Sequence, residues 1–356
     1  MAPAMTTTVL LAGRYGPVHD VTIEVFEIDD PLRPRRISGH AGVEDASFLE
    51  FHPVLPVVYA VSETTQFDGR PGGGVVSLLL DPEHGALREM NRVSSLGDGP
   101  CHVAIDAEGR RLFVANYLSG SVAAYELHAD GSIGAPVGSA QHRGAGPTAR
   151  QTGPHAHCVR VLSTPQVLYA VDLGADEVIC YDAGEQLVST SVWAAKPGAG
   201  PRHLAVHPNR PIAALVNELD NSLVTFDIAP TGELAAAATL STLPCDANVV
   251  SLAADVRFDR SGSHIYVSNR GHDSVALYSC GGSAADVDLV AHVPTGGRSP
   301  RCLVLLPSGQ VMYVANQDSD VLTVLALDPG TGRPGDALPF HTMAAPAVVA
   351  TREVEW

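Results

Sequence analysis

Arginine, histidine and glutamate side chains recur in this chain at two kinds of position, after a Gly-Pro or Ser-Pro pair and at the end of an apolar run. Guanidinium groups bind carboxylate or phosphate through forked hydrogen bonds and can stabilise an oxyanion. A carboxylate and an imidazole together can move a proton or activate water. The residues after the proline pairs are His102, His155, His157, Arg202, His203 and Arg301, and those at the ends of apolar runs are Glu218 and Arg270.

An internal repeat must position these residues. Each copy reads as a strand, a polar turn and a second strand, and copies begin at Val9, Val57, Leu112, Leu168, Ala213, Ile265 and Met312. The intervals of roughly 45 to 56 residues are in the range of propeller blades. Most copies have another apolar strand before them and a more variable strand after them, which gives four strands per copy. The repeat predicts an all-β chain, a seven-bladed β-propeller of four-stranded antiparallel blades that forms one domain over residues 1–356.

Blade geometry predicts which residues meet. The first strand of a blade lines the central channel and the second runs back beside it, so the start of the first and the end of the second lie at one mouth. The arginine, histidine and glutamate residues named above occupy these two places. At the other end of the chain, residues around 337–351 supply apolar sequence without a full new blade, and we expect them to join the N-terminal strand in one mixed blade that closes the ring.

Composition excludes several partners. The chain has 22 Lys+Arg against 39 Asp+Glu and a formal net charge of -17, so it lacks the broad positive field that nucleic acids or anionic membranes require. We expect no membrane span, because apolar runs are far shorter than a spanning helix needs. Six cysteines without CxxC spacing predict buried thiols of a reduced, cytoplasmic protein. We expect no metal and no cofactor, and the sequence leaves the oligomeric state open.

Each candidate residue also has a structural interpretation. His102 and His203 share a repeat position, so a structural role is as well supported as a functional one. Glu218 and Arg270 differ from the residues at the same place in other copies, which favours function because the scaffold does not need their charges. The asparagines that recur at the ends of second strands are expected to hold turns through hydrogen bonds from the side chain to the backbone. These are Asn116, Asn217, Asn269 and Asn316.

Three phrases carry a family resemblance. GPHAHCVRV, GPRHLAVHPN followed by VNELDNSLVTF, and RFDRSGSHIYVSNRGHDSVALY resemble the lactonase family of seven-bladed propellers, over essentially the whole chain. That family includes bacterial 6-phosphogluconolactonases and fungal 3-carboxy-cis,cis-muconate lactonising enzymes. The resemblance implies a catalytic set of His155, Arg202, Glu218 and Arg270. His157 is an alternative for the histidine, because the register of PHAHC is ambiguous.

The first hypothesis is hydrolysis of a small anionic lactone, 6-phosphogluconolactone. Glu218 or the histidine would activate water, Arg202 would stabilise the oxyanion, and Arg270 with Arg301 would hold the anionic group. His102, His157 and His203 are further candidates for substrate binding. The same residues would serve a cycloisomerase that closes a carboxymuconate, with the arginines holding carboxylates. A non-catalytic binding scaffold is the third hypothesis, which the absence of a repeated Trp-Asp ending disfavours.

Overall fold

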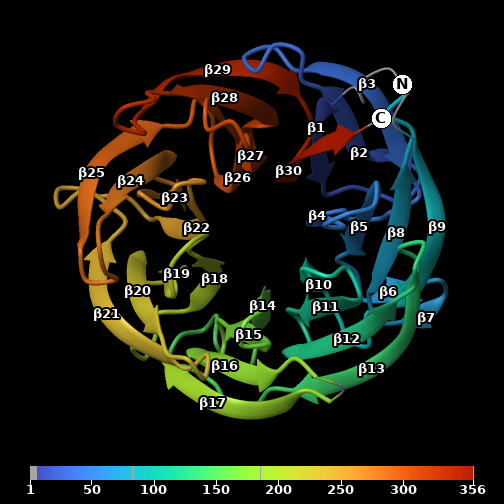
Figure 1. The fold of residues 1–356 in the computed structure, drawn as a ribbon, viewed down its shortest axis with the longest axis horizontal. Coiled ribbons are helices and arrows are strands. Elements are labelled where there is room, and N and C mark those ends of the chain that lie inside the picture. Colours follow the sequence, from blue (N-terminus) through green and yellow to red (C-terminus); the bar gives the residue numbers. More distant parts are fainter. Residues whose placement is uncertain (1–5, 82–83, 185, 356) are drawn as a thin grey trace.

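Seven four-stranded antiparallel sheets follow one another around a central axis in a computed structural model of the chain (Figure 1). The structure describes residues 6–81, 84–184 and 186–355. The prediction of an all-β, seven-bladed propeller is confirmed, and the helix found in the described residues is one 3-10 turn, η1 (Gln317–Ser319). No helix in this part of the chain is long and apolar enough to cross a membrane.

The first strand of each blade is the innermost, as the sequence analysis expected. It packs against the innermost strands of the two neighbouring blades. From the innermost strand outward, the first three complete blades are β4 (Leu49–Phe51), β5 (Val57–Ser62), β8 (Gly74–Leu80) and β9 (Leu87–Ser94); β10 (Pro100–Ile105), β11 (Arg111–Asn116), β12 (Ser121–Leu127) and β13 (Ile133–Gln141); and β14 (Ala156–Leu162), β15 (Val167–Asp172), β16 (Glu177–Asp182) and β17 (Val188–Ala194).

The next three blades have the same strand order, without the short hairpin of β6 (Gln66–Phe67) and β7 (Arg70–Pro71) that lies between β5 and β8 in the sequence. The blades are β18 (Pro201–Val206), β19 (Ile212–Asn217), β20 (Ser222–Ile228) and β21 (Leu234–Ser241); β22 (Leu252–Phe258), β23 (His264–Arg270), β24 (Ser274–Cys280) and β25 (Val287–Pro294); and β26 (Pro300–Leu305), β27 (Val311–Asn316), β28 (Val321–Leu327) and β29 (Pro334–Thr342).

The ring closes in a blade that contains both ends of the chain. Its order is β30 (Pro346–Glu355) innermost, then β1 (Thr6–Arg14), β2 (Val21–Glu27) and β3 (Arg35–Ala41). β1 and β30 pair antiparallel from Thr6 opposite Glu355 to Arg14 opposite Pro346, which confirms the predicted closure. The predicted boundary was too early, because Ala337 to Thr342 lie in β29 and complete the preceding blade.

The middle strands are apolar because each blade is covered on both faces by its neighbours. Every residue of β5, β19 and β27 is buried, whereas the outer strand β17 alternates between exposed and half-buried residues. A strand buried on both faces reads as a continuous apolar run, and this is what made the repeat visible in the sequence.

Tyrosines tie neighbouring blades together. In four second strands a buried tyrosine hydroxyl donates a hydrogen bond to a backbone carbonyl in a turn of the next blade. The pairs are Tyr59 with Gly131 at 2.7 Å, and Tyr169 with Gly232, Tyr266 with Gly332 and Tyr313 with Pro31, each at 2.8 Å. Each bond satisfies two polar groups that would otherwise be buried without partners. Neighbouring blades are thereby fixed relative to one another.

The prediction for the recurring asparagines was wrong for Asn217 and Asn316, whose amides bind side chains of the following strand and not the turn backbone. The side-chain amide of Asn217 donates to Ser222 Oγ at 2.8 Å, and that of Asn316 donates to Thr323 Oγ1 at 2.9 Å. The prediction for the cysteines is confirmed for five thiols, which are free and buried, but Cys245 is exposed.

Candidate active site

Glu218 lies at the centre of a cluster of arginines at one mouth of the channel. It directly follows β19, while Arg202 is the second residue of β18 and Arg270 is the last residue of β23. The carboxylate oxygen Oε2 accepts a hydrogen bond from Arg202 Nε at 3.0 Å and lies 2.7 Å from Arg270 Nη2. Residues from two blades therefore meet as blade geometry predicted.

The surrounding arginines keep Glu218 ionised. Burial alone would raise the pKa of this carboxyl group, but Arg270 and Arg202, together with other nearby arginines, lower it to about 2. The carboxylate is 2% exposed and is held by charged partners on both of its oxygens. A base with so low a pKa accepts a proton poorly at neutral pH.

Arg150 also belongs to this cluster, and it was not predicted from the sequence. Its Nη2 atom donates to Glu218 Oε1 at 3.1 Å and to the Tyr117 hydroxyl at 3.2 Å, while its side chain remains 51% exposed. Arg150 belongs to the connection between β13 and β14, residues 142–155, the longest link between an outer and an inner strand in the described chain. The length of this link is the sequence signal that could have drawn attention to it.

His155 stands beside the cluster, and its Nε2 has no hydrogen-bond partner among the described residues. Its ring stacks on Tyr117 at 4.5 Å, and its Nδ1 lies 2.9 Å from the Tyr117 carbonyl oxygen. Because a carbonyl only accepts hydrogen bonds, Nδ1 carries a proton, and in the neutral ring the lone pair is on Nε2. Asp172 fixes the backbone here, since its Oδ1 accepts from the His155 amide at 2.8 Å.

Arg301 carries further positive charge on another side of the mouth. Its guanidinium lies 5.4 Å from the centroid of the Tyr15 ring, and the Tyr15 hydroxyl donates to Glu63 at 2.9 Å. Tyr15 and Glu63 come from the two weakest copies of the repeat and were not predicted. With four arginines and two glutamates, the cluster has two more positive than negative charges, although the whole chain is strongly acidic.

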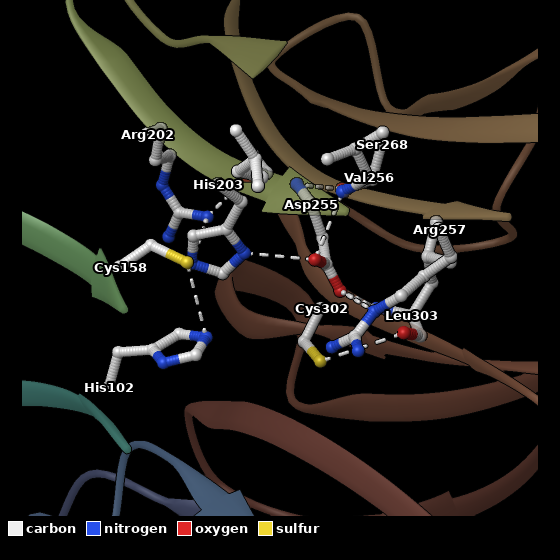
Figure 2. A network of polar contacts seen from close by, with 12 residues as sticks. His102, Cys158, Arg202, His203, Asp255, Val256, Arg257, Ser268, Cys302 and Leu303 are labelled. Carbon is white, nitrogen blue, oxygen red and sulfur yellow. Dashed lines mark hydrogen bonds and ion pairs between the residues drawn. The ribbon is translucent and has the colours of Figure 1, made fainter. Parts of the chain in front are cut away.

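The other three predicted histidines lie deeper and form a buried group. The ring centroids of His102 and His157 are each 5.3 Å from that of His203, and Phe48 stacks on His102 at 4.0 Å. Burial lowers the pKa of His203 to about 3 and lowers the pKa values of His102 and His157 well below the usual value. The three rings are therefore neutral at pH 7. Both ring nitrogens of His203 have partners, Asp255 and Arg202, as Figure 2 shows.

This buried group predicts that the protein loses stability in mild acid. A histidine whose pKa is depressed in the folded state binds a proton more readily when unfolded, so stability is present above the ordinary pKa and is lost as pH falls below it. Each such histidine contributes a slope of up to about 1.4 kcal/mol per pH unit below pH ~6.5. Urea unfolding at pH 7.5, 6.5 and 5.5 should show a steep decrease in the free energy of unfolding.

The substitution His102→Gln should make this decrease shallower by about one histidine's share. The exposed His19, whose side chain is 79% accessible, gives the matched control, since His19→Gln should leave the slope unchanged. Equal stability at pH 7.5 and 5.5 would show that these rings are not held neutral by burial.

A cavity opens at the opposite mouth of the channel. It is lined by the ends of β14, β18, β22 and β26, including Arg160, Arg257 and His207. His207 is a turn residue there, with its Nδ1 accepting from the backbone amides of Asn209 and Arg210 at 3.0 Å. The arginine–glutamate cluster and His155 lie at the other mouth, where the chemistry named above is possible.

Known proteins share this architecture. Residues 9–350 match the family model described as lactonase, 7-bladed beta-propeller. The 6-phosphogluconolactonase of Bacillus subtilis strain 168 is 33% identical over 334 residues, which cover 92% of this chain and 94% of that protein. The 6-phosphogluconolactonase of Pectobacterium carotovorum strain PC1 is 31% identical over 289 residues, covering 78% of this chain and 82% of that one.

Solved structures show the same likeness. The periplasmic gluconolactonase of Pseudomonas aeruginosa superposes with a TM-score of 0.89 at 28% identity, covering 98% of this chain and 99% of that chain. A protein from Lactobacillus plantarum superposes with a TM-score of 0.89 at 26% identity, covering 98% and 100%. On its fold and its match over most of its length, the chain belongs to the lactonase family of seven-bladed β-propellers.

Proposed function

We propose that this protein is a lactone hydrolase that converts 6-phosphogluconolactone to 6-phosphogluconate. The observation that carries the proposal is the local excess of two positive charges at a mouth that also holds Nε2 of His155, an imidazole nitrogen with no hydrogen-bond partner among the described residues. A phosphate group is a dianion at neutral pH, and forked guanidinium groups bind it well. Two curated relatives named 6-phosphogluconolactonase support this substrate.

Each residue has a role that follows from its contacts. Nε2 of His155 takes a proton from water as the water oxygen attacks the lactone carbonyl carbon. The carbonyl oxygen becomes an oxyanion, which Arg202 stabilises through Nη2, for which the described residues provide no hydrogen bond. When the ring C–O bond breaks, the leaving oxygen takes the proton back from His155. Arg270 and Arg301 hold the phosphate, as the sequence analysis proposed.

Glu218 organises the arginines and does not act as the base. Its low pKa and its ion pairs with three guanidinium groups make it a poor proton acceptor, whereas they make it a strong anchor for Arg150, Arg202 and Arg270. From sequence alone, either Glu218 or the histidine could be the base. The geometry favours the histidine, and it favours His155 over the buried His157.

The test is a lactonase assay on freshly made 6-phosphogluconolactone, with 6-phosphogluconate detected by its dehydrogenase and the spontaneous rate subtracted. Unphosphorylated gluconolactone and a 3-carboxymuconate are run in parallel, the latter followed by the loss of its diene absorbance. A preference for the phosphorylated lactone would support the proposal. Faster turnover of gluconolactone, or cycloisomerisation of the carboxymuconate, would replace the substrate or the reaction while keeping the fold.

Arg150 is expected to act in substrate binding. Arg150→Gln removes one charge from the rim and frees one Glu218 oxygen, but leaves Arg202 and His155 in place. We expect KM for the phosphorylated lactone to rise by about 10-fold, because a charge-assisted hydrogen bond contributes roughly 1.5–3 kcal/mol. Steady-state kinetics should show kcat nearly unchanged and KM for unphosphorylated gluconolactone less affected. A fall in kcat at constant KM would instead place Arg150 in the chemical step.

We further propose a cytoplasmic location for this chain. Its cysteines are all free thiols, which suits a reducing compartment. One structural neighbour is a periplasmic enzyme, so fractionation of cells that express the tagged full chain is the direct measurement.

A further inference from the structure

Asp255 is a buried carboxylate that the proposed reaction does not use. It lies in β22, is 1% exposed, and is surrounded by hydrogen-bond donors from three blades (Figure 2). Its Oδ1 contacts His203 Nδ1 at 2.9 Å and the Val256 amide at 3.0 Å. Its Oδ2 accepts from Arg257 Nε and from the Leu303 amide, both at 3.1 Å.

These contacts keep Asp255 ionised. Burial would raise the pKa of the carboxyl group, but Arg257, His203 and the Leu303 amide lower it far below its usual value. A buried carboxylate that is ionised accepts hydrogen bonds and donates none. The proton shared between Asp255 and His203 therefore resides on Nδ1 of the imidazole.

This tautomer determines what His203 presents to Arg202. With Nδ1 protonated and the ring neutral, Nε2 carries a lone pair and lies 3.3 Å from Arg202 Nη1. The same guanidinium nitrogen also donates to the Ala254 carbonyl, and Nε donates to Glu218. The opposite tautomer would direct an N–H toward a guanidinium N–H, which cannot form a hydrogen bond.

We propose that Asp255 is a positioning residue that sets the tautomer of His203 and, through it, orients the guanidinium of Arg202 for the oxyanion. A chain of contacts thus runs from Asp255 through His203 to Arg202 and ends at Glu218. The kinetic consequence rests on the lactonase function proposed above. The tautomer itself does not.

The first experiment therefore needs no activity. Long-range proton–nitrogen spectra of the wild-type protein, labelled with ¹⁵N-histidine, report which ring nitrogen carries the proton, and the His203→Gln variant assigns the signal. We expect His203 to be neutral with the proton on Nδ1 at pH 7. A proton on Nε2, or on both nitrogens, would overturn the proposal even if the enzyme is fully active.

The second experiment separates positioning from stability by a double-mutant cycle. Asp255→Asn should lower kcat by about 100-fold, the scale of a misplaced catalytic group, with less effect on KM. In an Arg202→Lys background the same substitution should add little, because the oriented fork is already lost. Arg257→Gln, the matched control, disrupts the same buried ion pair and should lower thermal stability but largely spare kcat.

Independent, additive effects of Asp255→Asn and Arg202→Lys on kcat would refute the positioning role. If wild-type protein shows no lactonase activity, the proposed function fails, while the tautomer measurement still decides the structural part of the proposal.

Discussion

Glu218→Gln is expected to lower kcat/KM for lactone hydrolysis by about 1,000-fold, within the range seen when preorganised electrostatic groups are removed. The carboxylate binds Arg150, Arg202 and Arg270 at the same time, so its neutralisation releases all three from their common anchor. The reacting geometry is lost together with the charge. Kinetics on the purified variant, with folding checked by circular dichroism, measure the effect.

The same substitution should also destabilise the protein. Arg202 is 1% exposed and Arg270 is largely buried, and without Glu218 their charges repel each other. Removal of one partner of a buried ion pair costs about 3–5 kcal/mol. Inorganic phosphate should restore part of this loss in the variant, because the anion can take the place of the carboxylate between the guanidinium groups.

A matched control is Glu63→Gln. Glu63 also lies at this mouth, but it bonds to the Tyr15 hydroxyl and makes no ion pair with the central arginines among the described residues. We expect a decrease in activity of less than 10-fold for this variant. If Glu218→Gln retained full activity in a folded protein, Glu218 would have no place in the mechanism and the scaffold hypothesis would regain support.

The fold could be predicted because its information is repeated along the chain. The strand-turn-strand pattern occurs seven times, and in each copy a strand is buried on both faces. Such strands read as continuous apolar runs, as in β5, β19 and β27, and these runs made the copies recognisable. The central cluster could be predicted for the opposite reason. Glu218 and Arg270 replace residues that the repeat does not require to be charged, so they stood out against it.

Arg150 and Asp255 could not be found in the same way. Arg150 lies outside the repeat, in a connecting segment whose path over the mouth depends on tertiary packing. Asp255 lies in an inner strand whose start carries no Gly-Pro pair, and the pairing of β22 with β23 shifts register between Ala253 and Val256. Such an irregularity redirects side chains, and a repeat overlay does not detect it.

The repeat pattern also could not predict how deeply each histidine is buried. His155 and His157 are two residues apart and both contact Tyr117. His155 stacks on that ring at 4.5 Å and is half-buried, whereas His157 meets it edge-on at 5.4 Å and is 5% exposed. The sequence placed both at the start of one inner strand. His157 is the second residue of β14, and His155 immediately precedes that strand. Which ring reaches the mouth depends on the stacking partner that the neighbouring blade supplies.

The substitution His155→Asn should remove the general base without disturbing the hydrogen bond that holds the side chain. The asparagine amide can keep the hydrogen bond that Nδ1 makes to the Tyr117 carbonyl, but it has no atom in the place of Nε2. We expect kcat for 6-phosphogluconolactone to fall by about 100- to 10,000-fold, the usual range for loss of a general base, with little change in KM or in thermal stability.

The pH dependence distinguishes this role from a structural one. A general base acts only in its unprotonated form, so an imidazole base predicts that the wild-type activity falls at acid pH. In His155→Asn the residual rate should lose this acid limb. His157→Asn is the comparison, because that ring is neutral and buried, and the wild-type acid limb should persist in it. If the acid limb disappeared in His157→Asn but not in His155→Asn, the general base would be His157, and the proton would have to reach it through the buried side of the channel.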